Sequence, residues 1–166
     1  MQDKISAQKS KRLEQIDSID IEKELYRIME NPEKYFEPYL KNVTNPAEII
    51  FVQFSILSLL RTIDTSKKFC IKSADHFLSK YSVTKWLDKL SDFYEYNISI
   101  INYILENHDN AILDIYNEKQ ITKTMMEQGL RAFSKAKKQL TKDKEDAVTC
   151  LKDLEVEKEK AKEFLD

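Results

Sequence analysis

The chain has 166 residues, of which 42% are hydrophobic and 34% are charged, with one glycine and three prolines. This length supports one hydrophobic core rather than two, and the scarcity of glycine and proline excludes a sheet built on hairpins and tight turns. The 27 basic and 29 acidic side chains give a formal net charge of −2, so no overall field directs the chain to nucleic acid or anionic lipid. We expect an all-α protein, a helical bundle of about four helices with a long, coiled-coil-like C-terminal helix.

The expected domain organisation has three parts. Residues 1–17 form a basic, flexible tail, because Lys4, Lys9, Lys11 and Arg12 stand against Asp3 alone within the first twelve residues. Residues 18–129 form the core of the bundle. Residues 130–166 form the extended C-terminal helix.

The two cysteines indicate a reducing compartment. Cys70 and Cys150 are far apart, with no CxxC spacing that would indicate a metal cassette, and a chain this rich in apolar residues needs no disulfide. No apolar N-terminal segment marks the chain for secretion, although removal of a signal would leave the same sequence. We therefore expect a cytoplasmic protein, with Cys70 an inert buried thiol and Cys150 placed where it could cross-link a parallel dimer.

The first helix signals lie before residue 40. Asp20, with two glutamates in the turn after it, begins a helix that ends by Glu30. Asn31 and Pro32 restart the helix as an N-cap and a first helical residue. Pro38 is expected to limit this second run and to make it a connector.

The clearest helix start is Asn45–Glu48, which has a capping asparagine, a proline at the next position and a glutamate three residues after the cap. The following run, Ile49–Leu60, is apolar nearly all round, so the helix is buried on every side or lies in a membrane. Twelve residues span about 18 Å, short of the roughly 20 residues that cross a bilayer, and Arg61 ends the run. The expectation is a central core helix and no membrane span.

Two amphipathic helices follow. Residues 65–81 have one apolar side. Residues 84–106 have two adjacent apolar rows, one of which contains Trp86, Phe93, Ile100 and Ile104, so this helix should contact two neighbours.

The segment Asn107–Asn110 is expected to break the helical pattern, with Asp109 or Asn110 capping a final helix from Ala111 to about Phe164. An uninterrupted helix of that length would measure roughly 80 Å, so part of it should protrude from the core. Gly129 and Thr141 are the expected positions for a bend.

The C-terminal helix contains a diluted heptad pattern in which leucines alternate with lysines. Steps of four and three give Met126, Leu130, Phe133, Lys137, Leu140, Lys144, Ala147, Leu151, Leu154, Lys158, Ala161 and Leu165, which we call the seam. Its polar positions are compatible with a solvated helix end held by weak ion pairs. They are equally compatible with a surface reserved for another chain.

The sequence predicts a non-catalytic interaction or scaffolding module with no cofactor, in which the seam pairs with a protein partner or a second copy. The expected contact residues are Leu130, Phe133, Lys137, Leu140, Lys144, Leu151 and Leu154. An alternative is a regulator or effector that binds a specific protein through the bundle surface. Nucleic acid is not expected, because the tyrosine-rich stretch is acidic and base-stacking platforms lie in basic grooves.

A second alternative is a metal-dependent phosphohydrolase. His76 follows Asp75, and His108 precedes Asp109, and helical phosphohydrolases of the HD class hold a divalent ion with such residues. The resemblance is limited to these dipeptides. His108 and Asp109 fall at an expected helix boundary, where capping accounts for them.

Overall fold

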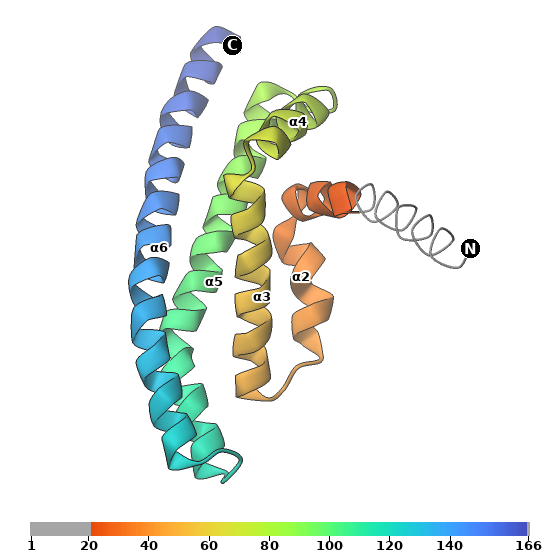
Figure 1. Ribbon diagram of the computed structural model, residues 1–166. Helices are drawn as coiled ribbons and strands as arrows, with labels where there is room; N and C mark the ends of the chain where they lie inside the picture. The colour runs from red at the N-terminus through yellow and green to blue at the C-terminus, as the bar shows by residue number, and fades with distance from the viewer. Residues whose placement is uncertain (1–20, 166) are drawn as a thin grey trace, which may run out of the picture.

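The computed structural model describes residues 21–165, where all regular elements are α-helices. The tail expected at 1–17 lies outside these residues. A helical segment over residues 21–30 comes first. It is followed by α2 (Pro32–Lys41), α3 (Pro46–Thr65), α4 (Lys67–Leu78), α5 (Val83–Asn117) and α6 (Lys123–Leu165). The prediction of an all-α protein with a long C-terminal helix is confirmed (Figure 1).

The helix starts at Asn31 and Asn45 are confirmed. The side chain of Asn31 accepts a hydrogen bond from the Lys34 amide at 3.1 Å, and that of Asn45 accepts one from the Ala47 amide at 2.9 Å. Each pairs a backbone donor that the helix itself leaves free. The expected end at Pro38 was wrong, since α2 continues through this residue to Lys41. Only the hydrogen bond that the missing Pro38 amide would make is lost.

The core helix α3 is longer and more exposed than expected. It has 20 residues and runs past Arg61. One side is buried, with Ile56 and Leu60 3% and 0% exposed, but Phe51 is 74% exposed and Leu59 44%. The expectation of burial on every side was therefore wrong, because neighbouring helices cover only part of the circumference.

The expected break at Asn107–Asn110 does not occur, and α5 continues through it to Asn117. His108 and Ala111 are buried at 9% and 3% exposure, so packing outweighs the weak helix preference of asparagine and aspartate. The chain instead turns at residues 118–122, where Lys119 adopts a positive φ of 61°. The Thr122 hydroxyl accepts a hydrogen bond from the Met125 amide and caps the start of α6.

Helix α6 is continuous over 43 residues, with no break at Gly129 or Thr141. A Cβ on Gly129 would meet Ile112 at 3.7 Å, an ordinary contact, and the Thr141 hydroxyl donates to the Lys137 carbonyl within the helix. The boundary expected after residue 129 therefore falls inside one helix. This helix lies antiparallel to α5 along most of its length (Figure 1).

The main core lies where α5 contacts α3 on one side and α6 on the other, which confirms that the wide apolar stripe of α5 has two neighbours. Trp86, Phe93, Ile100 and Ile104 are all buried there. Helix α4 packs at one end, where Phe77 stacks on Trp86 with ring centroids 4.8 Å apart. This arrangement fixes which faces of α3 and α6 remain accessible.

Candidate interaction surface

Three of the twelve seam positions are buried inside the monomer. Phe133 is 4% exposed, Leu140 3% and Ala147 7%, and the first two belong to the main core. The expectation that Phe133 and Leu140 contact a partner is corrected, because both side chains already pack against other helices of the same chain.

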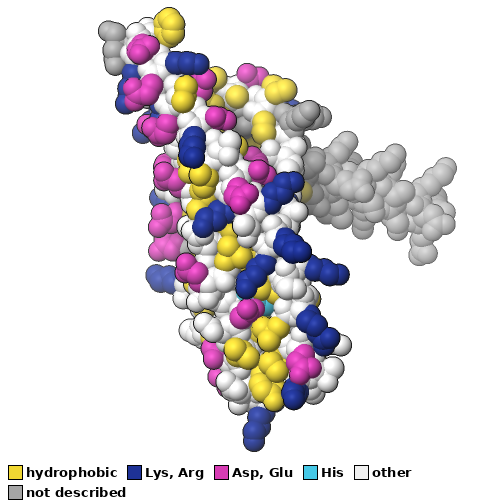
Figure 2. Space-filling model, turned by 90° about the vertical axis from the view of Figure 1, so that its left-hand side faces the viewer, with side chains coloured by type: hydrophobic (Ala, Val, Ile, Leu, Met, Phe, Trp, Pro, Cys, Tyr) yellow, Lys and Arg dark blue, Asp and Glu magenta, His cyan; other side chains and the backbone are white. Residues whose placement is uncertain are grey.

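Five other seam positions lie at the edge of the contact with α5. Leu130 and Lys144 are half-buried and Lys137 is exposed. Leu151 and Leu154 are also half-buried. In Figure 2, which faces α6, charged side chains of both signs flank a line of hydrophobic ones.

Two of the seam lysines form ion pairs with carboxylates of α5. The Lys137 ammonium lies 3.6 Å from an oxygen of Asp109, and the Lys158 ammonium lies 3.2 Å from an oxygen of Asp88. Burial lowers the pKa of Lys158, but Asp88 and Glu155 outweigh this and leave the pKa raised. Each lysine covers apolar surface with its stem while its charge is paired at the edge.

A groove separates α3 from α6 at the surface of the protein. It has a volume of about 320 Å³ and is lined by Phe54, Leu57, Ser58, Arg61, Ala136, Gln139 and Leu140. The lining is largely apolar, and its polar groups lie at the end near Arg61. A neighbouring hollow of about 290 Å³ shares Leu57, Arg61 and Gln139 and continues towards Cys150. We call the two together the α3–α6 groove.

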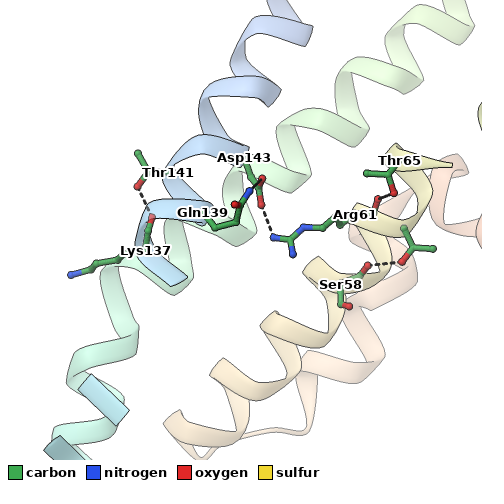
Figure 3. A network of polar contacts seen from close by, with 8 residues as sticks. Ser58, Arg61, Thr65, Lys137, Gln139, Thr141 and Asp143 are labelled. Atoms are coloured by element: carbon green, nitrogen blue, oxygen red, sulfur yellow. Dashed lines mark hydrogen bonds and ion pairs between the residues drawn. The ribbon is translucent and has the colours of Figure 1, made fainter. Parts of the chain in front are cut away.

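One ion pair joins the two sides of this groove. A guanidinium nitrogen of Arg61 lies 2.5 Å from an oxygen of Asp143, whose other oxygen accepts a hydrogen bond from the Gln139 amide at 2.8 Å (Figure 3). The Arg61 side chain is 51% exposed. Because the pair is at the surface, it orients the two helices more than it stabilises them.

The face of α3 beside the groove carries no charge between Glu48 and Arg61. The hydroxyls of Ser55, Thr62 and Thr65 donate to carbonyls one turn earlier in the same helix. This face therefore combines exposed Phe51 with hydroxyls that already have partners. It can be buried without removing a charge from water.

With 20 residues, α3 reaches the length at which a helix can span a membrane, which the twelve-residue apolar run did not. By length and composition, α3 is the one helix among residues 21–165 that is apolar enough to cross a membrane, and 33% of its most apolar stretch is buried. The core helix of a globular protein satisfies the same criteria.

The two histidines lie in different surroundings. His108 is buried, stacks on Phe133 with ring centroids 3.6 Å apart, and has its Nδ1 3.1 Å from Asp109. His76 stacks on Tyr26 with centroids 4.3 Å apart. Among residues 21–165, no three His, Cys, Asp or Glu side chains are grouped as a metal site requires.

The cysteines differ from expectation in one respect. Cys70 is exposed, not buried. Partial burial, with a contribution from Asp64, raises the pKa of its thiol. Cys150 is half-buried at the end of the α3–α6 groove, and burial, together with Asp64, raises its pKa as well. Raised pKa values keep both thiols protonated near neutral pH and lower their reactivity.

Comparison of the chain with protein-family models, with curated proteins and with solved structures gave no match. The functional argument therefore depends on the geometry of the surface. The α3–α6 groove was not predicted from the sequence, because it depends on how far apart two helices lie on a third. The absence of charge from Ile49 to Leu60 was the one available signal.

Proposed function

We propose that this protein is a non-catalytic interaction module that binds a helix of a partner protein in the α3–α6 groove. The observation that carries the proposal is the uncharged face of α3 beside the groove, on which Phe51 is 74% exposed. Large side chains exposed next to a groove are typical of protein interfaces.

A helix is the partner element that suits this groove. Helices α3 and α6 run in the same direction on α5 (Figure 1). The apolar lining of the groove between them consists of Phe54, Leu57, Ala136 and Leu140. An amphipathic helix fills such a groove with residues spaced at i, i+3, i+4 and i+7. Added to α3, α5 and α6, it would complete a four-helix arrangement.

The distribution of charge around the groove also favours an amphipathic helix as the partner. Between Glu48 and Arg61 the α3 side of the groove contributes apolar groups and hydroxyls, so an apolar helix face can cover this part without leaving an unpaired charge buried. The ion pair of Arg61 and Asp143 lies at the rim and offers hydrogen-bonding groups to polar residues of the partner. Apolar contacts in the middle and polar contacts at the rim are the usual arrangement of an interface.

A second copy of the chain is the competing partner, through the end of α6. Val156 is 55% exposed and Phe164 88%. The last turns of α6 therefore present apolar side chains to the solvent, where the same helix of a second copy could cover them. The phosphohydrolase alternative is not carried forward, since the stacking of His108 on Phe133 gives that histidine a packing role.

Photocrosslinking at two matched positions tests the proposal. A benzoylphenylalanine replaces Phe51 in one protein and Ile71, which is 67% exposed on α4, in the other. We expect a discrete adduct with another protein from position 51 and none from position 71. The crosslinked partner segment is then synthesised as a peptide, and its affinity is measured for the unlabelled wild-type protein.

The affinity of the peptide tests whether the groove is its binding site. Ser58→Glu, at the exposed edge of the groove, should weaken peptide binding at least tenfold, since it places a charge against an apolar helix face. Ile71→Glu should leave binding unchanged, and both variants should keep the wild-type unfolding midpoint. Equal adducts at both positions, or peptide binding unaffected by Ser58→Glu, would overturn the proposal, whereas an adduct between two copies would favour self-association.

A further inference from the structure

A second, larger groove lies between α2 and α5. Its volume is about 960 Å³, and it shares no lining residue with the α3–α6 groove. Leu40, Tyr96 and Ile100 supply its apolar surface. We call it the α2–α5 groove.

The walls of the α2–α5 groove are acidic. Its carboxylates are Glu30, Glu33, Glu37, Asp92 and Glu95, against the ammonium groups of Lys41 and Lys89. The Lys89 ammonium lies 2.9 Å from the Glu30 carboxylate, so these two charges neutralise each other. Four carboxylates and one ammonium remain, which makes the groove attractive to a cationic ligand.

These four carboxylates have no ion-pair or hydrogen-bond partner within the part of the chain that the structure describes. They come from two helices on opposite walls, Glu33 and Glu37 from α2 and Asp92 and Glu95 from α5. Like charges on facing walls repel each other, and a cationic segment between them would remove this repulsion.

Tyr96 adds an independent indication of a ligand. Its hydroxyl is buried in the wall of the groove and has no hydrogen-bond partner among residues 21–165. The ring stacks on Phe36 with centroids 5.9 Å apart, which fixes the position of the hydroxyl. Buried hydroxyls normally have a partner, so a ligand with a donor or acceptor would satisfy this one.

The chain itself contains a segment with the complementary charge. Between Lys4 and Arg12 there are four basic side chains and no acidic one. Eight residues, 13–20, separate this segment from the helical residues 21–30, and Glu30 at the end of those residues lines the groove. The helical residues cover about 14 Å, and eight extended residues cover roughly 26 Å, so the segment is long enough to return to the groove.

We propose that the basic segment Lys4–Arg12 binds in the α2–α5 groove of its own chain, with its lysines and arginine opposite Glu33, Glu37, Asp92 and Glu95. The short connection keeps the segment at an effective concentration in the millimolar range. Contacts that would be weak between separate molecules are then sufficient.

Carbodiimide crosslinking of the full chain tests this directly, because the reagent joins an amine to a carboxylate only when the two are in contact. We expect Lys4, Lys9 or Lys11 to couple to the four groove carboxylates at least fivefold more than to Asp114 and Glu118, at the far end of α5. Coupling of Lys158 to Asp88, which lie 3.2 Å apart, is the positive control.

Two further measurements show whether the coupling depends on the basic charges and whether it occurs within one molecule. In Lys9→Gln/Lys11→Gln/Arg12→Gln, which keeps Lys4, coupling of Lys4 to the groove should fall at least fivefold while the Lys158 control stays unchanged. An equal mixture of ¹⁴N and ¹⁵N protein shows whether the coupled residues belong to one molecule. Coupling no greater than at Asp114 and Glu118, or unchanged Lys4 coupling in the triple variant, would overturn the proposal, and so would crosslinks of mixed isotope.

Discussion

The imidazole of His108 lies almost parallel to the ring of Phe133, with centroids 3.6 Å apart and an angle of 14° between the planes. This stack joins α5 to α6 towards the end at which the chain turns from one helix into the other. Phe54 of α3 approaches Phe133 edge-on at 6.2 Å, so one aromatic side chain holds three helices together. Phe133 is also one of the seven residues that the sequence pattern assigned to a partner.

We predict that Phe133→Ala lowers the free energy of unfolding by about 3–5 kcal/mol, since it leaves a cavity among three helices. Urea unfolding followed by circular dichroism measures the change. Lys135→Ala, at an exposed position of the same helix, is the control and should change the value by less than about 0.5 kcal/mol. A loss below about 1 kcal/mol in Phe133→Ala would mean that α6 does not pack on α5 in solution.

A double-mutant cycle should give a coupling energy of only about 0.2–1 kcal/mol for Arg61 and Asp143, because the Arg61 side chain is 51% exposed and water screens the pair. The cycle uses Arg61→Ala, Asp143→Ala and the double variant. High salt should reduce the coupling further. A coupling above about 2 kcal/mol would indicate that something covers the α3–α6 groove and excludes water from this pair.

The contribution of Glu30 to stability should depend on pH. Burial raises the pKa of Glu30, but hydrogen bonds from Tyr81 and Lys89 and the charge of Lys89 outweigh this, so the pKa is lowered overall. A carboxyl with a lowered folded-state pKa stabilises the protein above its unfolded pKa of about 4.3 and loses this effect as the pH falls through the folded value.

The stability difference between wild type and Glu30→Gln should therefore be constant from about pH 6 to 7 and shrink below about pH 4. Tyr81→Phe removes one of the hydrogen bonds that lower the pKa, so in this background the stability difference should be smaller and its loss should be complete at a higher pH. A difference that does not change between about pH 3 and 7 would contradict the arrangement of Glu30, Tyr81 and Lys89.

Replacing Pro38 by alanine should stabilise the protein by about 1–3 kcal/mol, because alanine restores a backbone donor inside α2 and Pro38 is exposed. Pro46→Ala is the matched control. Pro46 is the first residue of α3, where no intrahelical partner for the amide exists. This substitution should be neutral or slightly destabilising, and equal effects of the two would show that α2 does not extend through Pro38.

Removal of all residues after Lys142 should destabilise the core, whereas the division expected from the sequence, with a core that ends at residue 129, would leave the core folded. The removed part includes Ala147, which is 7% exposed, and Lys158, which pairs with Asp88 of α5. Its loss would expose the apolar surface of α5 to water. Removal of residues 160–166 alone is the control, since Phe164 is 88% exposed; similar unfolding midpoints for both truncations would contradict the packing of α6.

Local sequence determined the helices and several of their ends. The capping asparagines at 31 and 45 act within one turn, so the sequence is sufficient to predict them. The apolar stripe of α5 likewise predicted two neighbours, because its width depends only on the order of residues. The uncharged run from Ile49 to Leu60 was also visible in the sequence, but the sequence did not show that one side of it is exposed beside a groove.

Tertiary structure decided what the sequence pattern left open. The helix continues through Asn107–Asn110 because α6 buries His108 and Ala111, a contact between residues about 25 positions apart that no local preference encodes. The same contact directs Phe133 and Leu140 inward and leaves Lys137 beside Asp109. A heptad pattern states which residues share a face, but only the position of the neighbouring helix decides whether that face is covered by the chain itself or left for a partner.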